Sequence, residues 1–472
     1  MASPVIFWFR RDLRLADNPA LSAAAALGRP VVPLFVVDDQ LLAPSGPTRA
    51  AYLEATLGAL SSSLDDSLVV RRGSPAEVIR DLAREVGADS VFATGDSANY
   101  GRRRDHRVAE ALSEAGITAH FVSTPYIVPP GTIRSKTGDP FKVFTAFRRV
   151  WDTLEVEAPL PAPSVVWATV DGEPLSVISQ NAGKVRPAFF SDRLPDAPPP
   201  LPAVGESAAW QLVHSFHGRI DRYDETRNDP GLNGTSALSP HLRWGTIHPR
   251  QLVAEFAGPG DGRRVWISEV TWREFYADVL FHQPQSVWEN LQPQMNYLQI
   301  DRDASALQRF EAWALGETGY PLVDAGMRQL LATGWMHNRV RMVAASFLVK
   351  HLHLDWRWGA RWFMWRLFDG DLASNQHGWQ WTAGTGTDAA PYHRIFNPTT
   401  QAERFDPRGE YVTTFIPELR GTAAPQCLQP GGGEGLLAPT GYVAPIVEAK
   451  AEREEALRRF AEAREMAKAA RG

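Results

Sequence analysis

The sequence predicts an α/β domain built on a parallel, Rossmann-like sheet, followed by an all-α domain. Apolar runs of strand length alternate with segments that suit helices up to about residue 125. A proline-rich stretch with little periodicity follows at 155–205, and beyond it a helical period returns without a further series of strands. We therefore expect an α/β domain at 1–130, an interdomain linker at 131–205 and a helical domain at 206–472.

The individual elements follow from the same patterns. The expected strands are the apolar runs at 5–9, 31–37, 68–70, 91–93 and 119–122. The expected helices between them lie at 21–27, 76–85 and 104–114. In the second domain, 265–281 and 325–349 are long and amphipathic. The tail at 448–471 places Glu454 and Glu455 four residues before Arg458 and Arg459, which predicts a solvated helix.

Composition excludes several classes of protein. A net charge of −5 excludes a globally basic nucleic-acid coat, although it allows a local basic patch. The single cysteine excludes a disulfide framework, a cysteine zinc site and an iron–sulfur cluster, and the twelve histidines form no ligand-like cluster, so we expect no metal. No apolar run has the length of a membrane helix, and residues 5–9 lead directly into Arg10-Arg11, unlike a secretion signal. We expect a cytoplasmic protein.

Tryptophan is the unusual residue in this chain. Thirteen of the sixteen tryptophans lie between Trp210 and Trp381. A large helical core explains such a density, because indoles are mostly buried. The alternative is that a cofactor, stacked bases or an electron path requires them.

Four stretches of the second domain combine chemically useful side chains. On a helix, Glu269, Trp272 and Tyr276 share one face, although an amphipathic helix with a polar edge has the same pattern. Residues 335–342 place Trp335, Asn338 and Met342 on one predicted stripe, where a buried amide would need partners. Residues 369–381 combine acidic, amide and indole groups, and residues 223–240 offer hydroxyls after a glycine that suit a phosphate or a helix cap.

These stretches, taken in order with three others, resemble the photolyase/cryptochrome family, and most closely the class I cyclobutane pyrimidine dimer DNA photolyases. The matching segments are Phe9–Pro19, Thr235–Pro240, Trp272–Tyr276, Thr318–Pro321, Trp335–Arg339, Asp369–Leu372 and Phe396–Pro398. The resemblance implies FAD held in a bent form in the helical domain. It assigns to FAD the residues Tyr223, Thr235, Ser236, Ala237, Leu238, Ser239, Trp266, Arg273, Arg341, Asp369, Gly370, Asp371 and Asn375.

The resemblance also implies a reaction. Reduced FADH⁻ absorbs light and passes one electron to a cyclobutane pyrimidine dimer flipped out of DNA; the ring splits and the electron returns, so the enzyme is a carbon–carbon lyase. Arg341, paired with Asp369, would favour the anionic flavin. The catalytic residues would be Glu269, Asn338, Asn375, Trp379 and Trp356. The DNA and lesion contacts would be Arg227, Glu269, Trp272, Tyr276, Asn338, Arg339, Met342 and Trp381.

A cryptochrome-type photoreceptor without repair activity is the alternative function. (6-4) Photolyases carry histidines at the positions of Asn338 and Met342, and many plant cryptochromes carry Asp at the position of Asn375, so these three residues favour dimer repair. The expected partner is damaged DNA, and we expect a monomer that binds no membrane.

Asp303 and Ala237 depart from the family pattern, the latter replacing a residue that is often basic, and Gly101 bears on the antenna chromophore. Trp379 and Trp356 match the inner and middle tryptophans of the family's photoreduction path, but Asp303 stands where we expect the outer one, and Tyr297, Trp358 and Trp362 remain alternatives. Gly101 replaces a glutamate of folate-binding members, so an antenna chromophore would be a deazaflavin rather than a folate, with an empty or FMN-filled site as alternatives. Its candidate contacts are Asp38, Arg49 and Asp96.

Overall fold

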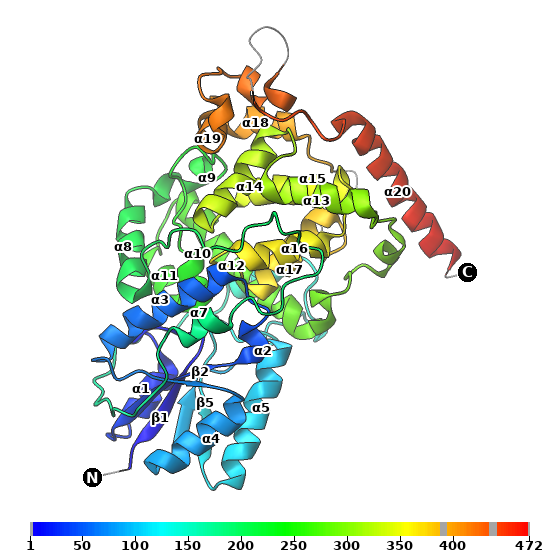
Figure 1. The fold of residues 1–472 in the computed structure, drawn as a ribbon. Helices are drawn as coiled ribbons and strands as arrows, with labels where there is room; N and C mark the ends of the chain where they lie inside the picture. The colour runs from blue at the N-terminus through cyan, green and yellow to red at the C-terminus, as the bar shows by residue number, and fades with distance from the viewer. Residues whose placement is uncertain (1–2, 388–393, 434–440, 471–472) are drawn as a thin grey trace. The chain divides into compact units, whose positions relative to one another are not determined.

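The computed structural model describes residues 3–387, 394–433 and 441–470. The chain, drawn as a ribbon in Figure 1, divides into two compact units. The first contains the residues up to 186 together with 201–224 and 236–284, and the second contains 187–200, 225–235 and the described residues from 285 onward. The first unit thus includes segments that the sequence analysis placed in the helical domain, and the domain boundaries at 130 and 205 remain predictions.

The first unit contains the predicted parallel sheet. Its strands are β1 (Val5–Phe9), β2 (Val31–Val37), β3 (Val69–Arg72), β4 (Ser90–Ala93) and β5 (Thr118–Phe121), in the order β3-β2-β1-β4-β5. Every pairing is parallel, and Phe7 of β1 stands opposite Pro33 of β2 and Phe92 of β4. Every residue of β1 and β2 is buried, as expected for apolar strands covered on both faces. The predicted fold class is confirmed.

Helices connect the strands and continue through the rest of this unit. The connecting helices are α1 (Pro19–Ala25), α2 (Asp39–Leu42), α3 (Pro47–Ser63), α4 (Pro75–Val86) and α5 (Asn99–Glu114). The later helices are α6 (Phe144–Trp151), α7 (Val177–Asn181), α8 (Gly205–His217), α9 (Tyr223–Thr226, which runs into the second unit), α10 (Ser239–Trp244), α11 (Pro249–Glu255) and α12 (Asp261–His282). The helices α6 and α7 lie inside the predicted linker, where α6 packs against α12.

All regular secondary structure among the described residues of the second unit is helical. Its α-helices are α13 (Ala304–Leu315), α14 (Pro321–Thr333), α15 (Asn338–Lys350), α16 (Trp356–Arg366), α17 (Leu372–Ala383), α18 (Pro398–Phe405), α19 (Glu410–Phe415) and α20 (Ala449–Ala469). One apolar core contains Trp313, Trp356, Trp362, Trp365 and Trp379. These five indoles are therefore buried in the helical core, and for Trp313, Trp362 and Trp365 this agrees with the simple interpretation of the tryptophan density. Among the described helices, none has the length and apolar character needed to cross a membrane.

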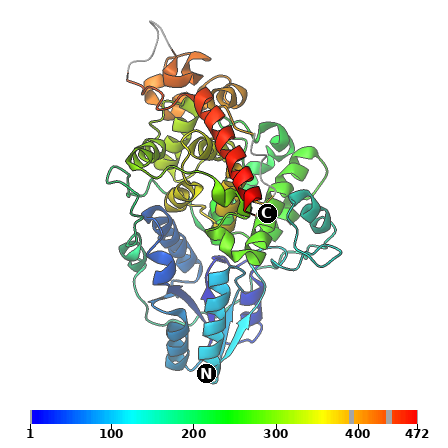
Figure 2. The same ribbon diagram turned by 90° about the vertical axis from the view of Figure 1, so that its right-hand side faces the viewer.

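Two sequence-based expectations about these helices need correction. The helix expected at 325–349 is two helices, because α14 ends at Thr333, Gly334 adopts a φ of 65°, and α15 begins only at Asn338. Trp335 therefore does not share a helical stripe with Asn338. The tail does form a helix, the long red α20 of Figure 2, with Glu455 paired to Arg459 at 2.7 Å. One face of α20 is buried rather than solvated, since Phe460 is 2% exposed.

Candidate functional site

The candidate residues on α12 lie on one partly exposed face of the first unit. Glu269, Trp272 and Tyr276 recur at intervals of three and four residues, and all three are partly buried, as the helical spacing predicts. Phe144 of α6 stacks on Trp272 with ring centroids 3.6 Å apart and planes 8° apart. This stack covers one face of the Trp272 indole. The rest of the side chain belongs to the partly exposed face of α12.

Two other candidates on α12 make contacts inside the first unit. Trp266 is 4% exposed, and its ring lies 4.7 Å from that of Phe256 in an edge-on arrangement. The Arg273 guanidinium donates hydrogen bonds to the carbonyl oxygens of Pro125 (3.1 Å) and Leu242 (3.3 Å). Arg273 therefore joins α12 to two other segments of its own unit, and its contact with FAD remains a prediction.

The predicted phosphate-side residues are divided between the two units. Tyr223 and Leu238 are buried in the first unit, whereas Thr235 belongs to the second. Ala237 adopts a φ of 54°, a left-handed conformation that is uncommon for residues other than glycine. Gly234 lies so close to Thr226 that a side-chain Cβ would come within 2.8 Å of the Thr226 carbonyl oxygen. The backbone between α9 and α10 is therefore constrained at two points, at Gly234 before Thr235 and Ser236 and at Ala237 after them.

A polar network fixes the start of α15 in the second unit. The Nδ1 atom of His337 accepts a hydrogen bond from the Arg339 N–H at 3.2 Å, and the side-chain oxygen of Gln329 accepts one from the His337 N–H at 3.2 Å. The Tyr411 hydroxyl donates to the same Gln329 oxygen at 2.8 Å. Burial, aided by the neighbouring arginines, lowers the pKa of His337 to about 4, so the imidazole is neutral and able to accept.

The predicted ion pair between Arg341 and Asp369 is present. Two nitrogens of Arg341 reach the two carboxylate oxygens of Asp369 at 3.2 and 2.8 Å, and its Nε donates to the Met336 carbonyl oxygen at 2.8 Å. The Asp369 side chain is 3% exposed and that of Arg341 is 24% exposed. A bidentate pair of this kind holds the guanidinium in one orientation.

The residues that follow Asp369 position α17. Asp371 caps the helix by accepting a hydrogen bond from the Ser374 N–H at 3.1 Å. The Asn375 amide donates to the Ala360 carbonyl oxygen at 3.1 Å and to the Gln376 side chain at 2.8 Å. Asn375 is therefore oriented by α16 and by its own helix, while its position beside the flavin stays a prediction. Gly370 is buried, and Trp381 is partly buried.

The remaining lesion and DNA candidates of the second unit lie at the starts of helices or near them. Asn338 is exposed at the first position of α15, and Met342 is partly buried one turn later. The Arg339 guanidinium donates to the Asn228 side-chain oxygen at 2.7 and 3.2 Å and lies 4.5 Å above the Phe405 ring. Arg227 is partly buried.

Both tryptophans assigned to the electron path are buried in the second unit. Trp379 packs on Gly359, where an added Cβ would come within 2.1 Å of the indole, and its ring centroid lies 6.0 Å from that of Trp313. Its N–H has no hydrogen-bond partner among the described residues. The Trp356 N–H donates to the Asn290 side-chain oxygen at 2.9 Å.

The outer member of this path remains open. Asp303 accepts a hydrogen bond from the Ala306 N–H at 2.8 Å and thereby caps α13, which is a structural role. Of the three aromatic alternatives, Tyr297 is 45% exposed, Trp358 is partly buried against Phe189, and Trp362 is fully buried. Tyr297 thus has the best access to solvent among them.

The antenna candidates lie in the first unit, where each of the three contacts other side chains. Asp38 accepts a hydrogen bond from the Tyr100 hydroxyl at 2.5 Å, and Asp96 pairs with Arg104 at 3.3 Å. The packing at position 101 favours glycine, because an added Cβ would lie 2.2 Å from the Asp96 carboxyl carbon. Arg49 lies 5.8 Å from the Trp244 ring.

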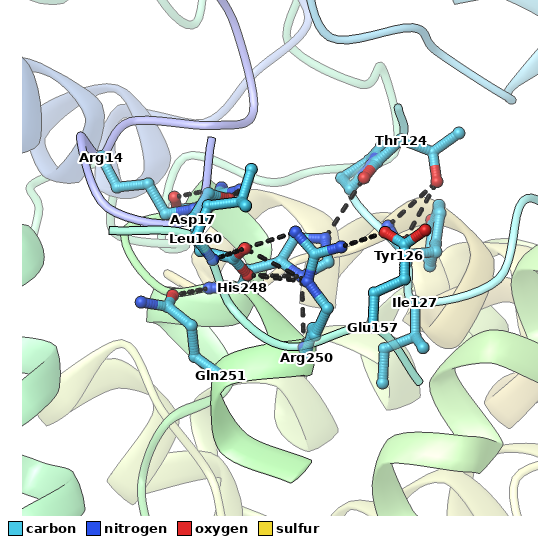
Figure 3. A network of polar contacts seen from close by, with 12 residues as sticks. Arg14, Asp17, Thr124, Tyr126, Ile127, Glu157, Leu160, His248, Arg250 and Gln251 are labelled. Carbon is cyan, nitrogen blue, oxygen red and sulfur yellow. Dashed lines mark hydrogen bonds and ion pairs between the residues drawn. The ribbon is translucent and has the colours of Figure 1, made fainter. Parts of the chain in front are cut away.

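A buried network that the sequence analysis missed surrounds Asp17 (Figure 3). The Asp17 carboxylate pairs with Arg250 and accepts a hydrogen bond from the Leu160 N–H at 3.0 Å. His248 lies beside it, 3.4 Å from Asp17, and contacts the Thr124 carbonyl oxygen at 3.3 Å. The network joins the start of α11 to the loops that contain Asp17, Leu160 and Thr124, all in the same unit. It shows that part of the Phe9–Pro19 motif serves the fold rather than the site.

Comparisons with known proteins identify the family. A family model for the FAD-binding domain of DNA photolyase matches residues 266–462, and a DNA photolyase family model matches residues 5–164. The deoxyribodipyrimidine photo-lyases of Vibrio cholerae and Halobacterium salinarum are 38% and 39% identical to this chain. The matches cover 96% and 97% of this chain and 98% and 99% of those relatives.

Solved structures agree with the sequence comparisons. The class III photolyase of Agrobacterium tumefaciens matches with a TM-score of 0.87 and 36% identity, over 98% of both chains. The Sulfolobus tokodaii photolyase with two FAD molecules (TM-score 0.83, 97% of this chain and 100% of that chain) and the Synechocystis cryptochrome (0.84, 97% and 99%) are each 28% identical.

Fold and sequence together define a two-part flavoprotein with a parallel sheet and an FAD-binding helical region. The chain belongs to the DNA photolyase family. It is an enzyme of that family and a DNA-repair flavoprotein.

The residues assigned to FAD have the chemistry that a flavin nucleotide requires. Ser236 and Ser239 offer hydroxyl donors suited to phosphate oxygens, and they flank the left-handed turn at Ala237. In the second unit, Arg341 supplies a fixed positive charge, held by Asp369, for an anionic ring system. The donor set therefore fits the group, and the contact that each residue makes with FAD remains a prediction.

Proposed function

We propose that this enzyme repairs cyclobutane pyrimidine dimers in DNA by a light-driven reaction that uses FAD in its reduced, anionic form. The observation that carries the proposal is the partly exposed face of α12, where Glu269, Trp272 and Tyr276 combine a carboxylate, an indole and a phenol. The names of the relatives, deoxyribodipyrimidine photo-lyase, support the same substrate. When bound, FAD in its reduced form would supply the light-driven one-electron chemistry that opens the ring.

The residues of α12 would bind the flipped-out dimer. A dimer outside the helix has lost its stacking partners, and an indole such as Trp272 replaces them because its face is large and apolar. The Glu269 carboxyl group would hydrogen-bond the base edge, which gives orientation as well as affinity. Tyr276 would complete the stripe on the same face.

The remaining candidate residues belong mainly to the second unit, and we propose a role for each of them. Asn338 offers amide groups to the base edge, and Met342 and Trp381 provide apolar surface. Arg341 would favour the anionic flavin through its positive charge, which Asp369 holds in place at 2.8 Å. Asn375 would face the flavin, and Arg227 and Arg339 would bind backbone phosphates beside the lesion.

We also propose a second chromophore in the first unit. The structure of the Sulfolobus tokodaii photolyase contains two FAD molecules, which supports a second flavin-like group in this family. A deazaflavin rather than a folate is our proposal here, because Gly101 leaves no room for a glutamate beside Asp96. Asp38, Arg49 and Asp96 are the candidate contacts, and extraction of chromophores from the purified protein followed by mass spectrometry identifies the group.

A photoreceptor without repair activity is the second candidate, and the match to the Synechocystis cryptochrome favours it. The deciding experiment illuminates chemically reduced protein with blue light in the presence of an oligonucleotide that carries one thymine dimer. Conversion of the dimer to two thymines, absent in the dark, is the expected result. If the dimer persists while the flavin stays bound and reduced, the photoreceptor function replaces ours.

A further inference from the structure

The side chain of Asn338, a candidate for binding the lesion, depends for its direction on the placement of its backbone. Asn338 is exposed at the first position of α15. Its side-chain amide forms no hydrogen bond with any residue that the structure describes. Arg339, the next residue, differs, because the Asn228 side chain accepts a hydrogen bond from its guanidinium at 2.7 Å. The direction of the Asn338 amide is therefore set by how firmly the first turn of α15 is held.

Three buried side chains hold that turn, and together they are called the α15-cap network below. They are Gln329 of α14, His337 at the N-cap of α15 and Tyr411 of α19. The Gln329 side-chain oxygen accepts hydrogen bonds from the His337 N–H at 3.2 Å and from the Tyr411 hydroxyl at 2.8 Å. The Nδ1 atom of His337 in turn accepts from the Arg339 N–H at 3.2 Å. The network thus runs from Tyr411 to the backbone of the residue that follows Asn338.

Two backbone N–H groups fix the direction of every hydrogen bond in the α15-cap network. A backbone N–H can only donate, so the Gln329 atom that meets the His337 N–H is the amide oxygen, and the Tyr411 hydroxyl must donate to it as well. The Nδ1 atom of His337 accepts from Arg339, and burial keeps this imidazole neutral by lowering its pKa to about 4. Because each contact has one possible donor, the network admits one arrangement of protons.

Tyr411 is itself held in place at the start of α19. The N–H groups of Tyr411 and Val412 donate to the two carboxylate oxygens of Asp406 at 3.1 and 2.9 Å. The Tyr411 ring also packs on Phe415, with ring centroids 5.2 Å apart. Tyr411 and Gln329 are 82 residues apart along the chain. The hydroxyl of a fixed side chain on α19 therefore supports the cap of α15 through a contact distant in sequence.

We propose that Tyr411 is a positioning residue for lesion binding, which acts through the α15-cap network to hold the Asn338 amide in the direction that the dimer requires. The proposal rests on the proposed function, because it takes Asn338 as a contact of the flipped-out dimer. A cap restrains the first turn of its helix, and Asn338 is the first residue after the cap. Without the Tyr411 hydroxyl, the Gln329 oxygen keeps one donor instead of two, so the cap that it supports gains freedom.

The first test compares two tyrosine hydroxyls in the same helical core. Tyr411→Phe should raise the Kd for a duplex that carries one thymine dimer by about two- to tenfold, the factor expected for one lost hydrogen bond. The Kd for the undamaged duplex and the flavin content should stay at the wild-type values. Tyr442→Phe is the matched control, because the Tyr442 hydroxyl donates to the Asp324 side chain at 2.7 Å in the same core.

Three outcomes of this comparison would overturn the proposal. They are an unchanged Kd for the dimer in Tyr411→Phe, an equal rise in the Tyr442→Phe control, and an equal rise for the damaged and the undamaged duplex. The last outcome counts because contacts with phosphates carry no information about the lesion, whereas the Asn338 amide meets the base edge.

A double-mutant cycle decides whether Tyr411 acts through Asn338. In an Asn338→Ala background, Tyr411→Phe should leave the Kd for the dimer nearly unchanged, because the amide that it positions is absent. In a Glu269→Ala background, which keeps Asn338, the full rise in Kd is expected. Equal rises in the two backgrounds would mean that Tyr411 affects the fold in general, and they overturn the proposal.

Substitution of His337 provides a rescue within the same network. His337→Ala removes the acceptor at the N-cap and should raise the Kd for the dimer, whereas His337→Asn keeps a side-chain oxygen at a position where Asn is a favoured cap and should recover most of the affinity. Hydrogen exchange of residues 337–342, followed by mass spectrometry without DNA, should be faster in Tyr411→Phe and His337→Ala than in the wild type. Unchanged exchange, or no recovery in His337→Asn, overturns the positioning role.

Failure of this inference is distinguishable from failure of the proposed function. Light-driven dimer repair by the wild type is measured first, and its absence refutes the function and the inference together. Where the wild type repairs the dimer, Tyr411→Phe should reach the wild-type yield at saturating DNA while requiring more DNA to saturate, because binding selects the molecules in which Asn338 is correctly placed. A loss of yield at saturation with an unchanged Kd overturns the inference and leaves the function standing.

Discussion

The phenyl ring of Phe144 stacks almost parallel on the indole of Trp272, with centroids 3.6 Å apart. Stacking of this kind is worth roughly 0.5 to 1.5 kcal/mol beyond area burial, and here it also restricts the indole to one orientation. We predict that Phe144→Leu raises the Kd for dimer-containing DNA several-fold and leaves undamaged DNA binding and flavin content unchanged. Fluorescence titrations with the two duplexes measure the difference.

Phe141→Leu is the matched control for that substitution. Phe141 lies three residues before Phe144, and its ring meets that of Phe147 edge-on, with ring centroids 6.4 Å apart. It should therefore leave the affinity for the dimer at the wild-type value. An equal loss of affinity in the two variants would mean that these residues affect binding through the folding of residues 141–147 and not through the orientation of Trp272.

The ion pair of Arg341 and Asp369 predicts an order of stability between two variants. Arg341→Gln leaves a carboxylate that is 3% exposed without its cation, whereas Asp369→Asn leaves a guanidinium that is 24% exposed. Leaving a charge without its partner destabilises the protein more when that charge is more deeply buried. Arg341→Gln should therefore lower the free energy of unfolding by roughly 3 kcal/mol, and Asp369→Asn should lower it by less. Urea denaturation measures both, and the reverse order contradicts the argument. Arg408→Gln, which removes an exposed pair with Glu410, is the control.

Substitution of Trp356 should distinguish photoreduction of the flavin from repair of the dimer. We predict that Trp356→Phe slows photoreduction of the oxidised flavin at least tenfold while repair by chemically reduced enzyme keeps its yield, because repair requires no electron from the protein. Absorbance of the flavin under illumination measures the first, and dimer conversion the second. Trp365→Phe provides a buried tryptophan outside the proposed path as the control. Equal loss of both activities in Trp356→Phe would assign this indole to packing.

The sequence predicts those features that depend on local spacing. The α12 face is one, because residues three and four apart meet on any helix, and the strands are another, because apolar runs of that length favour a parallel sheet. The break at Gly334 could have been foreseen, since glycine commonly ends a helix. The contacts of His337 with Gln329 and Tyr411 could not, because polar partners separated by many residues leave no periodic signal. The Asp17 network escaped prediction for the same reason, as Arg250 lies 233 residues away.

Glu269 should matter for the reaction more than for the cofactor. Its partly exposed position on α12 favours a contact with the substrate, so we predict that Glu269→Ala lowers the repair yield at saturating DNA several-fold while the flavin content stays at the wild-type level. Glu269→Gln keeps a hydrogen-bonding group and should recover part of the yield. Loss of flavin in both variants would instead make Glu269 a structural residue.

Glu274 gives the protein a pH-dependent stability that a single substitution can isolate. Its carboxylate accepts hydrogen bonds from the N–H groups of Ile127 and Val128, both at 3.0 Å. Burial raises the pKa of Glu274 to about 7 from an ordinary value of 4.5, against the lowering influence of Arg273 and of those two N–H groups.

The sign of the effect follows from which state holds the proton. Between pH 4.5 and about 7 the folded protein keeps a proton on Glu274 that the unfolded chain releases, so this residue's contribution to stability falls as the pH rises. The loss should total about 3 kcal/mol and level off above the folded pKa. Glu274→Gln cannot ionise and therefore lacks this loss of stability. The free energy of unfolding of the variant minus that of the wild type, measured by urea denaturation, should increase progressively from pH 4.5 to 7.5. Glu114→Gln, at an exposed position of α5, is the control. A difference between wild type and Glu274→Gln that stays constant across this range would contradict a raised pKa.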